Sequence, residues 1–262
     1  MQPIKVVVHG ASGRVGQEVF KAVCRESEMQ LVGAVDLKVA QDSLTLPDGS
    51  GSVPFSADLG YILTSCHPDV LVDFTIAQAT MSAVRLATEK GVNLVIGTTG
   101  LTKDELSEID RLAKANKVGA VVAPNFALGA VLMIHLAKTA AKYLDYAEII
   151  ELHHHLKVDA PSGTALATAK AMAAARGKPF LQPAGKASNS RGEVVEGATI
   201  HSVRLPGLMA HQEVILGGPG QTVSIRHDTI NRECYMPGVM LAIREVVKRQ
   251  GLTYGLDTLL GL

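Results

Sequence analysis

The stretch that decides the fold reads Val6-Val-Val-His-Gly10-Ala-Ser-Gly13-Arg-Val-Gly16, in which a β-branched run leads directly into three evenly spaced glycines. Valine favours strands, and glycines at this spacing let the chain turn sharply and approach a phosphate over the start of a helix. Asp36 follows a second β-branched run, where a carboxylate can accept hydrogen bonds from ribose hydroxyls. The pattern predicts a dinucleotide-binding unit, although such glycines can also serve only a tight strand-to-helix turn.

Short β-branched runs alternate with helical patterns through the rest of the first half, as is typical of parallel sheets. Thr102-Lys-Asp-Glu105 is a capping box that predicts a helix to about residue 115, and residues 78–90 predict another. The predicted strands are residues 6–9, 31–35, 70–73, 94–96 and 118–122.

The pattern changes in the second half, where extended runs follow one another and Gly217-Gly-Pro-Gly220 joins two of them as a tight turn. These runs predict a mixed or antiparallel sheet, and residues 232–248 predict a returning helix. We therefore expect an α/β protein with a Rossmann-type doubly wound parallel sheet and an inserted α+β domain. The expected domains are 1–124 with 234–262, and 125–233. The extended runs are residues 147–152, 199–203, 212–216 and 222–227.

Residues 151–165 read Glu-Leu-His-His-His-Leu-Lys-Val-Asp-Ala-Pro-Ser-Gly-Thr-Ala, the densest group of proton-transfer and anion-binding residues in the chain. His153 and Lys157 are four apart, which places side chains on one face of a strand and nearly so on a helix. Gly163 and Thr164 open an Ala-rich helical run, so their backbone N–H groups would be unpaired donors at a positive helix end. The segment predicts a site for a small carboxylate whose reaction moves protons.

Several residues near this segment keep more ordinary interpretations. Three successive histidines invite a metal site, but on a strand His154 points away from His153 and His155, and no other ligand has suitable spacing, so we predict none. His155 is expected to be a packed or surface residue, and Asp159 a turn residue. His201 and Arg204 could face the substrate or pair within the sheet.

The composition excludes some partners. Lys plus Arg (25) balances Asp plus Glu (25), so no basic field favours nucleic acid or an anionic membrane, and an anionic substrate must be held by local charge. The three widely spaced cysteines fit a reducing compartment, and Met1-Gln-Pro-Ile-Lys5 leads into a strand without a signal-peptide pattern. We expect a cytoplasmic protein, or a plastid one if a transit peptide has been removed. Residues 118–137 are apolar but interrupted by polar and turn residues, which favours strand, turn and helix over a membrane span.

Residues 151–165, here called the His/Lys segment, resemble the signature of bacterial-type 4-hydroxy-tetrahydrodipicolinate reductases. These enzymes of the lysine pathway are also called dihydrodipicolinate reductases. The resemblance continues through residues 10–16, 72–75, 97–100, 123–126 and 201–204. It implies NADH- or NADPH-dependent reduction of (2S,4S)-4-hydroxy-2,3,4,5-tetrahydrodipicolinate, with loss of water. It also implies a homotetramer built by the second domain's sheet.

The resemblance implies roles for individual residues. His153 would be the proton donor or acceptor, Lys157 the proton donor, and His154 with Gly163 and Thr164 the substrate anchors. The loops 97–100 and 123–126 would line the nicotinamide, with Phe74 as a wall, although by themselves they are equally typical of turns and Phe74 of a core. The implied cofactor residues are Gly10, Ala11, Ser12, Gly13, Arg14, Val15, Asp36, Gly97, Thr98, Thr99, Ala123, Pro124, Asn125 and Phe126.

Two positions depart from the family pattern, because Leu37 and Leu156 stand where some relatives carry basic or polar residues. Asp36 should favour NADH, while Lys38 could neutralise the 2′-phosphate of NADPH, so we expect use of both. Alternative functions are another reductase of a cyclic imine or small oxo-acid on the same scaffold, or a non-enzymatic NAD(H)-sensing protein. The sensor would need a DNA-binding or partner-binding module, and no segment of the sequence indicates one.

Overall fold

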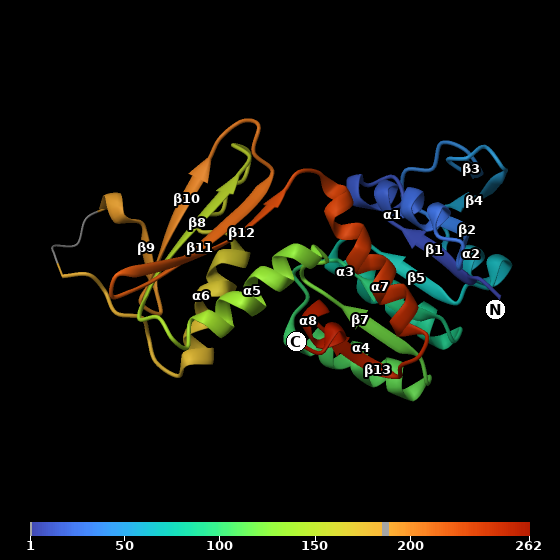
Figure 1. The fold of residues 1–262 in the computed structure, drawn as a ribbon. Coiled ribbons are helices and arrows are strands. Elements are labelled where there is room, and N and C mark those ends of the chain that lie inside the picture. Colours follow the sequence, from blue (N-terminus) through green and yellow to red (C-terminus); the bar gives the residue numbers. More distant parts are fainter. Residues whose placement is uncertain (1, 185–188) are drawn as a thin grey trace. The chain divides into compact units, whose positions relative to one another are not determined.

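The computed structural model describes residues 2–184 and 189–262, which divide into two compact units (Figure 1). The first unit comprises Met1–Leu128 and Tyr235–Leu262, and the second comprises Gly129–Cys234. The inserted segment expected from the sequence was 125–233. In the described residues, no helix combines the length and hydropathy that crossing a bilayer requires.

The first unit contains an eight-stranded sheet in the order β13-β7-β6-β5-β1-β2-β4-β3. All neighbours are parallel except β3 and β4, so the predicted doubly wound parallel sheet is confirmed. Five strands were predicted; β3, β4 and β13 were missed because they are short and carry Ser, Gly, Pro or Thr in place of an unbroken β-branched run. The strands are β1 (Ile4–His9), β2 (Met29–Val35), β3 (Ser43–Thr45), β4 (Ser52–Ser56), β5 (Val70–Asp73), β6 (Asn93–Ile96), β7 (Gly119–Val122) and β13 (Gly251–Tyr254).

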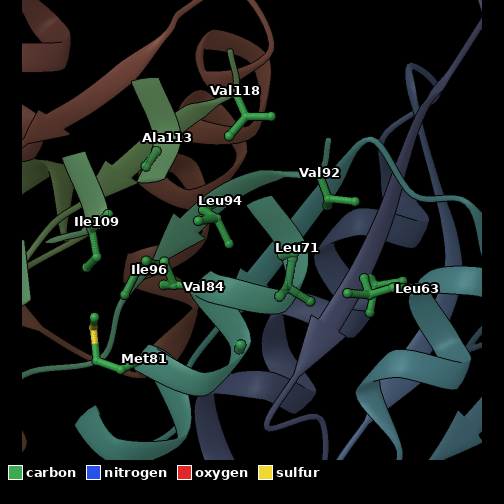
Figure 2. Packing of buried hydrophobic residues seen from close by; sticks show 14 of the residues in the cluster. Leu63, Leu71, Met81, Val84, Val92, Leu94, Ile96, Ile109, Ala113 and Val118 are labelled. Atoms are coloured by element: carbon green, nitrogen blue, oxygen red, sulfur yellow. The ribbon is translucent and has the colours of Figure 1, made fainter. Parts of the chain in front are cut away.

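The helices of this unit bury apolar side chains against the sheet. Thr102 and Glu105 form the predicted capping box at the start of α4. Figure 2 shows Leu71 and Leu94 of the central strands within one buried cluster that also includes Val84 and Ile109 of the covering helices. Each such fully buried side chain contributes about 1.5–3 kcal/mol to the stability of the sheet whose edge carries the loops described below. The helices are α1 (Arg14–Arg25), α2 (Leu59–Cys66), α3 (Ala77–Glu89), α4 (Lys103–Ala115), α7 (Met236–Val246) and α8 (Leu256–Leu260).

The second unit contains a five-stranded sheet in the order β12-β11-β8-β10-β9. Strands β8 and β10 are parallel and the other neighbours are antiparallel, so of the two predicted alternatives, a mixed or an antiparallel sheet, the sheet is mixed. The strands are β8 (Tyr146–His153), β9 (Glu193–Val195), β10 (Ala198–Arg204), β11 (Ala210–Gly218) and β12 (Gln221–Thr229).

Two helices accompany this second sheet, α5 (Leu128–Ala140) and α6 (Gly163–Arg176). Buried Ala165, Ala169 and Met172 of α6 share a core with Ile149 of β8 and Val214 of β11. Because alanine is small, α6 can approach the sheet closely. Its first turn consequently lies beside the end of β8, where the His/Lys segment begins.

Candidate active site

The His/Lys segment spans the end of a strand and the loop that follows it. His153 is the last residue of β8, whereas Lys157 lies in the loop between β8 and α6. The expectation that strand or helix periodicity would place them on one face was therefore wrong, because the chain leaves the strand directly after His153. His154 and His155 also lie beyond the strand and are exposed, so strand alternation does not govern them.

Glu151 is the most buried charged residue of this region, with none of its surface exposed. Its Oε2 lies 2.5 Å from Nδ1 of His153 and accepts a hydrogen bond from Nη1 of Arg204 at 2.8 Å. Its Oε1 accepts from Nη2 of Arg204 at 2.8 Å and from the backbone N–H of Ser162 at 3.1 Å. One carboxylate therefore joins the ends of β8 and β10 to the start of α6.

The surroundings of Glu151 favour its ionised form. Burial by itself would raise the pKa of this carboxyl, but hydrogen bonds from His153, Arg204 and Ser202 outweigh burial and lower the pKa to about 2. The Arg204 guanidinium supplies the compensating charge that a buried carboxylate requires. The carboxylate thus remains an acceptor of hydrogen bonds throughout the neutral pH range.

Lys157 forms an ion pair with a neighbour in its own loop. Its Nζ donates to both carboxylate oxygens of Asp159 at 2.8 Å, and this hydrogen bonding lowers the pKa of Asp159. The backbone carbonyl of Asp159 accepts from Nη2 of Arg204 at 2.7 Å. Asp159, expected to be only a turn residue, therefore connects Lys157 and its loop to the Glu151–Arg204 pair.

The first turn of α6 presents free backbone donors. Ser162 is the N-cap, and its Oγ accepts from the N–H of Ala165. The N–H groups of Gly163 and Thr164 have no carbonyl within the helix to accept them, as at every helix start. A Cβ placed on Gly163 would meet no atom within 4 Å, so the space above this turn is open. A helix therefore starts at Gly163, with backbone donors of the kind that can bind an anion.

Sequence reasoning left His201 and Arg204 open, and the structure separates them. His201 lies 2.5 Å from Glu148, on the opposite side of β8 from Glu151, and Glu148 also accepts from Arg191 at 2.8 Å. Arg204, in contrast, joins the group around His153. The sequence analysis gave Glu151 no role and did not choose between Arg204 and His201. One signal could have indicated Glu151: it stands two positions before His153 on a strand, so the two side chains share a face.

In the first unit, the glycine-rich turn connects β1 to α1. Gly10 has a φ of +84°, and a Cβ there would meet the backbone oxygen of Phe74 at 2.6 Å. A Cβ on Gly16 would lie 2.0 Å from the oxygen of Gly10, so only glycine lets the helix pack onto the turn. The N-cap residue Gly13 offers no side chain to the helix start. The backbone N–H groups of this start therefore remain available to a phosphate.

Asp36 stands directly after β2, as predicted, and contacts the glycine-rich turn. Its Oδ2 accepts from the N–H of Ser12 at 2.9 Å, and its Oδ1 accepts from the N–H of Lys38. The next residue, Leu37, is 90% exposed. A carboxylate and an exposed apolar side chain thus stand next to each other beside the glycine-rich turn.

The loops after β5 and β6 are tied together by a buried carboxylate. Asp73 accepts from Oγ1 of Thr75 at 2.7 Å and from Thr80, and lies 3.2 Å from Nδ1 of His9. Thr98 accepts from the N–H of Thr75 at 3.0 Å. Asp73, which we did not single out from the sequence, therefore lies where the ends of β1, β5 and β6 meet.

The predicted cofactor residues differ in exposure. The rings of Phe74 and Phe126 are 5.8 Å apart, but Phe126 is buried and serves the core. Ala11, Thr98 and Ala123 are also buried. The remaining predicted residues are exposed or half-buried, except for the buried Gly10: Ser12, Gly13, Arg14, Val15, Asp36, Gly97, Thr99, Pro124 and Asn125.

The sequence of this chain matches two family models and a relative of known name. The family model described as "Dihydrodipicolinate reductase, N-terminus" matches residues 4–126, and "Dihydrodipicolinate reductase, C-terminus" matches residues 129–260. A 4-hydroxy-tetrahydrodipicolinate reductase of Dehalococcoides mccartyi is 59% identical over 263 residues, covering 100% of both chains.

Solved structures resemble the chain as well. The dipicolinate-bound dihydrodipicolinate reductase of Paenisporosarcina sp. TG-14 is 41% identical, with a TM-score of 0.87, covering 98% of this chain and 99% of that one. An amine dehydrogenase of Mycobacterium smegmatis is 18% identical, with a TM-score of 0.68, covering 97% of this chain and 95% of that one, and shares the fold alone.

In the part of the chain that the structure describes, no group of three or more His, Cys, Asp or Glu residues could hold a metal ion.

Proposed function

The chain belongs to the dihydrodipicolinate reductase family, and we propose that His153, Lys157 and the start of α6 bind and protonate its substrate. It catalyses NAD(P)H-dependent reduction of (2S,4S)-4-hydroxy-2,3,4,5-tetrahydrodipicolinate to (S)-2,3,4,5-tetrahydrodipicolinate with loss of water, in lysine and diaminopimelate biosynthesis. The observation that carries the assignment is the buried Glu151 carboxylate, which holds His153 beside an open helix start.

The substrate is a dicarboxylate, and the first turn of α6 offers it backbone donors. The N–H groups of Gly163 and Thr164 belong to the positive end of the helix dipole. This dipole favours a bound carboxylate by about 0.3–1 kcal/mol, in addition to the hydrogen bonds. Open space at Gly163 supports close approach of the ligand. His154 and the Lys157 ammonium supply further donors, so a chain without net charge can hold two negative charges.

Proton transfer is assigned to His153 and Lys157. Loss of the substrate's 4-hydroxyl group as water creates a carbon–carbon double bond conjugated with the ring imine. A bound nicotinamide cofactor would supply the hydride to this conjugated system, and the resulting enamine must then gain a proton. Because Nδ1 of His153 is held by Glu151, its Nε2 is the nitrogen available to a ligand. Lys157 is an ammonium donor on the adjoining loop, where both carboxylate oxygens of Asp159 accept from it at 2.8 Å.

The cofactor is assigned to the edge of the parallel sheet in the first unit. The start of α1, with Ser12, Gly13, Arg14 and Val15, would hold the pyrophosphate, and Asp36 would hold the adenosine ribose. The fit is supported by the positive φ of Gly10 and by the close packing that Gly16 permits. The loops 97–100 and 123–126 would line the nicotinamide.

We also propose a homotetramer whose interface is the open face of the second unit's sheet. Residues of α5 and α6 share a core with one face of that sheet, whereas Glu148 and His201 lie on the other face. All three cysteines are free thiols, which favours a reducing compartment, and we assign the protein to the cytoplasm.

The assignment is tested by following NADH and NADPH oxidation with enzymatically generated hydroxytetrahydrodipicolinate. Wild type should turn over both cofactors, and His153→Gln should lower kcat by about 10²–10⁴, the range for a positioned acid or base. His201→Gln is the matched control, because its ring also lies 2.5 Å from a glutamate but on the opposite side of β8. Near-wild-type kcat in His153→Gln, or loss of NADH affinity instead, would place the active site elsewhere.

A further inference from the structure

We propose that Glu151 is a positioning residue that fixes the imidazole of His153 and selects Nε2 as the nitrogen that exchanges a proton with the substrate. A neutral imidazole has one donor nitrogen and one acceptor nitrogen, and the partner of one nitrogen decides the role of the other. The proposal deepens the function proposed above and rests on the role given there to His153.

The geometry around Glu151 determines the direction of its hydrogen bond with His153. Nη1 and Nη2 of Arg204 and the backbone N–H of Ser162 can only donate, and the ionised carboxylate can only accept. His153, 2.5 Å from Oε2, must therefore place its proton on Nδ1. Nε2 is then either a lone-pair acceptor or, in the imidazolium form, a proton donor.

The same carboxylate aligns the other groups of the site. Oε1 of Glu151 holds the N–H of Ser162, which caps the helix bearing Gly163 and Thr164. Arg204 in turn donates to the backbone carbonyl of Asp159, in the loop that carries Lys157. One buried ion pair therefore sets the positions of the proposed acid, its lysine partner and the anion-binding helix start.

Replacing Glu151 by glutamine should reverse the tautomer of His153. The new amide group needs an acceptor. An NH₂ at the Oε2 position would face Nη1 of Arg204 but also Nδ1 of His153, which can accept, whereas an NH₂ at the Oε1 position would face only the donors of Ser162 and Arg204. The amide oxygen is therefore expected at that position, with the NH₂ toward Nδ1 of His153. Nδ1 must then accept, so the proton moves to Nε2 and the imidazolium form loses its acceptor.

The charges around His153 reinforce this effect. Glu151 on β8 and Arg204 on β10 compensate each other, and Lys157 and Asp159 pair within the loop. In Glu151→Gln the positive charge of the Arg204 guanidinium is no longer compensated. It therefore disfavours a second positive charge on the nearby imidazole of His153. The limb of the pH–kcat profile that reports His153 should therefore move to lower pH.

Glu148→Gln is the matched control. Glu148 lies on the same strand and has partners of the same kinds, His201 at 2.5 Å and Arg191 at 2.8 Å, but it faces the other side. Both variants are compared with wild type at equal oligomeric state, measured by sedimentation. The measurements are kcat, KM, the pH profile, NADH affinity by calorimetry, and the ¹⁵N chemical shifts of the His153 ring.

Glu151→Gln should lower kcat about 10²-fold with little change in NADH affinity, and its ¹⁵N shifts should change from an Nδ1–H to an Nε2–H pattern. Glu148→Gln should keep kcat, pH profile and His153 shifts. Glu151→Asp preserves the negative charge, so it should keep the Nδ1–H pattern and recover part of kcat. If the glutamine variant does not fold, the aspartate variant provides the test in its place.

Two results would overturn the positioning role. The first is an unchanged Nδ1–H pattern in Glu151→Gln. The second is an Nε2–H pattern together with wild-type kcat in Glu151→Gln or Glu151→Asp. Either result would leave His153 as the proposed acid or base. Failure of that underlying role appears separately, as near-wild-type kcat in His153→Gln.

Discussion

The ammonium group of Lys157 lies 2.8 Å from both carboxylate oxygens of Asp159, two residues along the same loop. The Lys157 side chain is 22% exposed and that of Asp159 is 59% exposed, so the lysine is sheltered while its counter-ion faces solvent. An exposed carboxylate can be exchanged for a substrate carboxylate at little cost, because surface ion pairs contribute only about 0–1 kcal/mol. If Lys157 binds the substrate as proposed, we therefore expect a substrate carboxylate to replace Asp159 beside its ammonium group.

This relationship predicts opposite outcomes for the two partners. Lys157→Gln should lower kcat by about 10²–10⁴, since it removes a positioned proton donor. Asp159→Asn should leave kcat within a few-fold of wild type, because the substrate replaces the lost carboxylate. Steady-state kinetics of both variants provide the measurement, and equal losses in the two would show that Asp159 takes part in the chemical step itself.

The helix start at α6 predicts a change in substrate affinity alone. Thr164→Val removes a hydroxyl donor with little change of shape, and a hydrogen bond to a charged group contributes roughly 1.5–3 kcal/mol. KM for the substrate should rise roughly ten- to hundredfold, because 1.4 kcal/mol corresponds to a factor of ten. Pyridine-2,6-dicarboxylate should weaken as an inhibitor in parallel, with NADH affinity unchanged.

Gly163→Val provides the second arm of this test. A Cβ at Gly163 meets no atom within 4 Å, so the variant should fold while its side chain fills the space above the backbone donors. Calorimetric titration of each variant with the dicarboxylate and with NADH separates the two effects. If both variants bind the dicarboxylate as wild type does, the start of α6 is not the anion site.

Asp36 predicts a difference between the two cofactors. Asp36→Ala should lower kcat/KM for NADH by roughly ten- to hundredfold, because a charge-assisted hydrogen bond to the ribose is lost. NADPH should be affected less, since Asp36 also repels the 2′-phosphate and Lys38 remains nearby. Because Asp36 also accepts from the N–H of Ser12, a uniform rise in KM for both cofactors would instead indicate that its main role is to support the glycine-rich turn.

Glu151 predicts an acid-dependent loss of stability. Its pKa is lowered from 4.5 to about 2 in the folded protein, so its stabilising contribution is fully present above pH 4.5 and disappears as the pH falls through about 2. The contribution is on the order of 3 kcal/mol at neutral pH. Urea unfolding between pH 5 and 2.5 should show wild type losing stability faster than Glu151→Gln, which lacks this titration. Parallel curves for the two proteins would contradict the lowered pKa.

The parallel sheet could be predicted because each central strand is a short, unbroken β-branched run between helical patterns, and local pattern suffices to define such elements. The edge strands β3, β4 and β13 were missed because pairing with a neighbour stabilises segments whose own composition is ambiguous. The spacing of His153 and Lys157 illustrates a different failure. Both residues remain proposed site residues, but their four-residue spacing did not describe their geometry, because β8 ends between them.

The sequence by itself determined the α/β class and the glycine-rich turn with Asp36, and it indicated the segment that we propose to carry the reactive groups, because each depends on residues close together in the chain. Only the tertiary structure decided that Arg204 rather than His201 joins His153, and that Glu151 and Ser162 link the strand to the helix start. These contacts join residues up to 53 positions apart. They follow from the parallel register of β8 and β10, which sets Arg204 beside His153 and which no local pattern encodes.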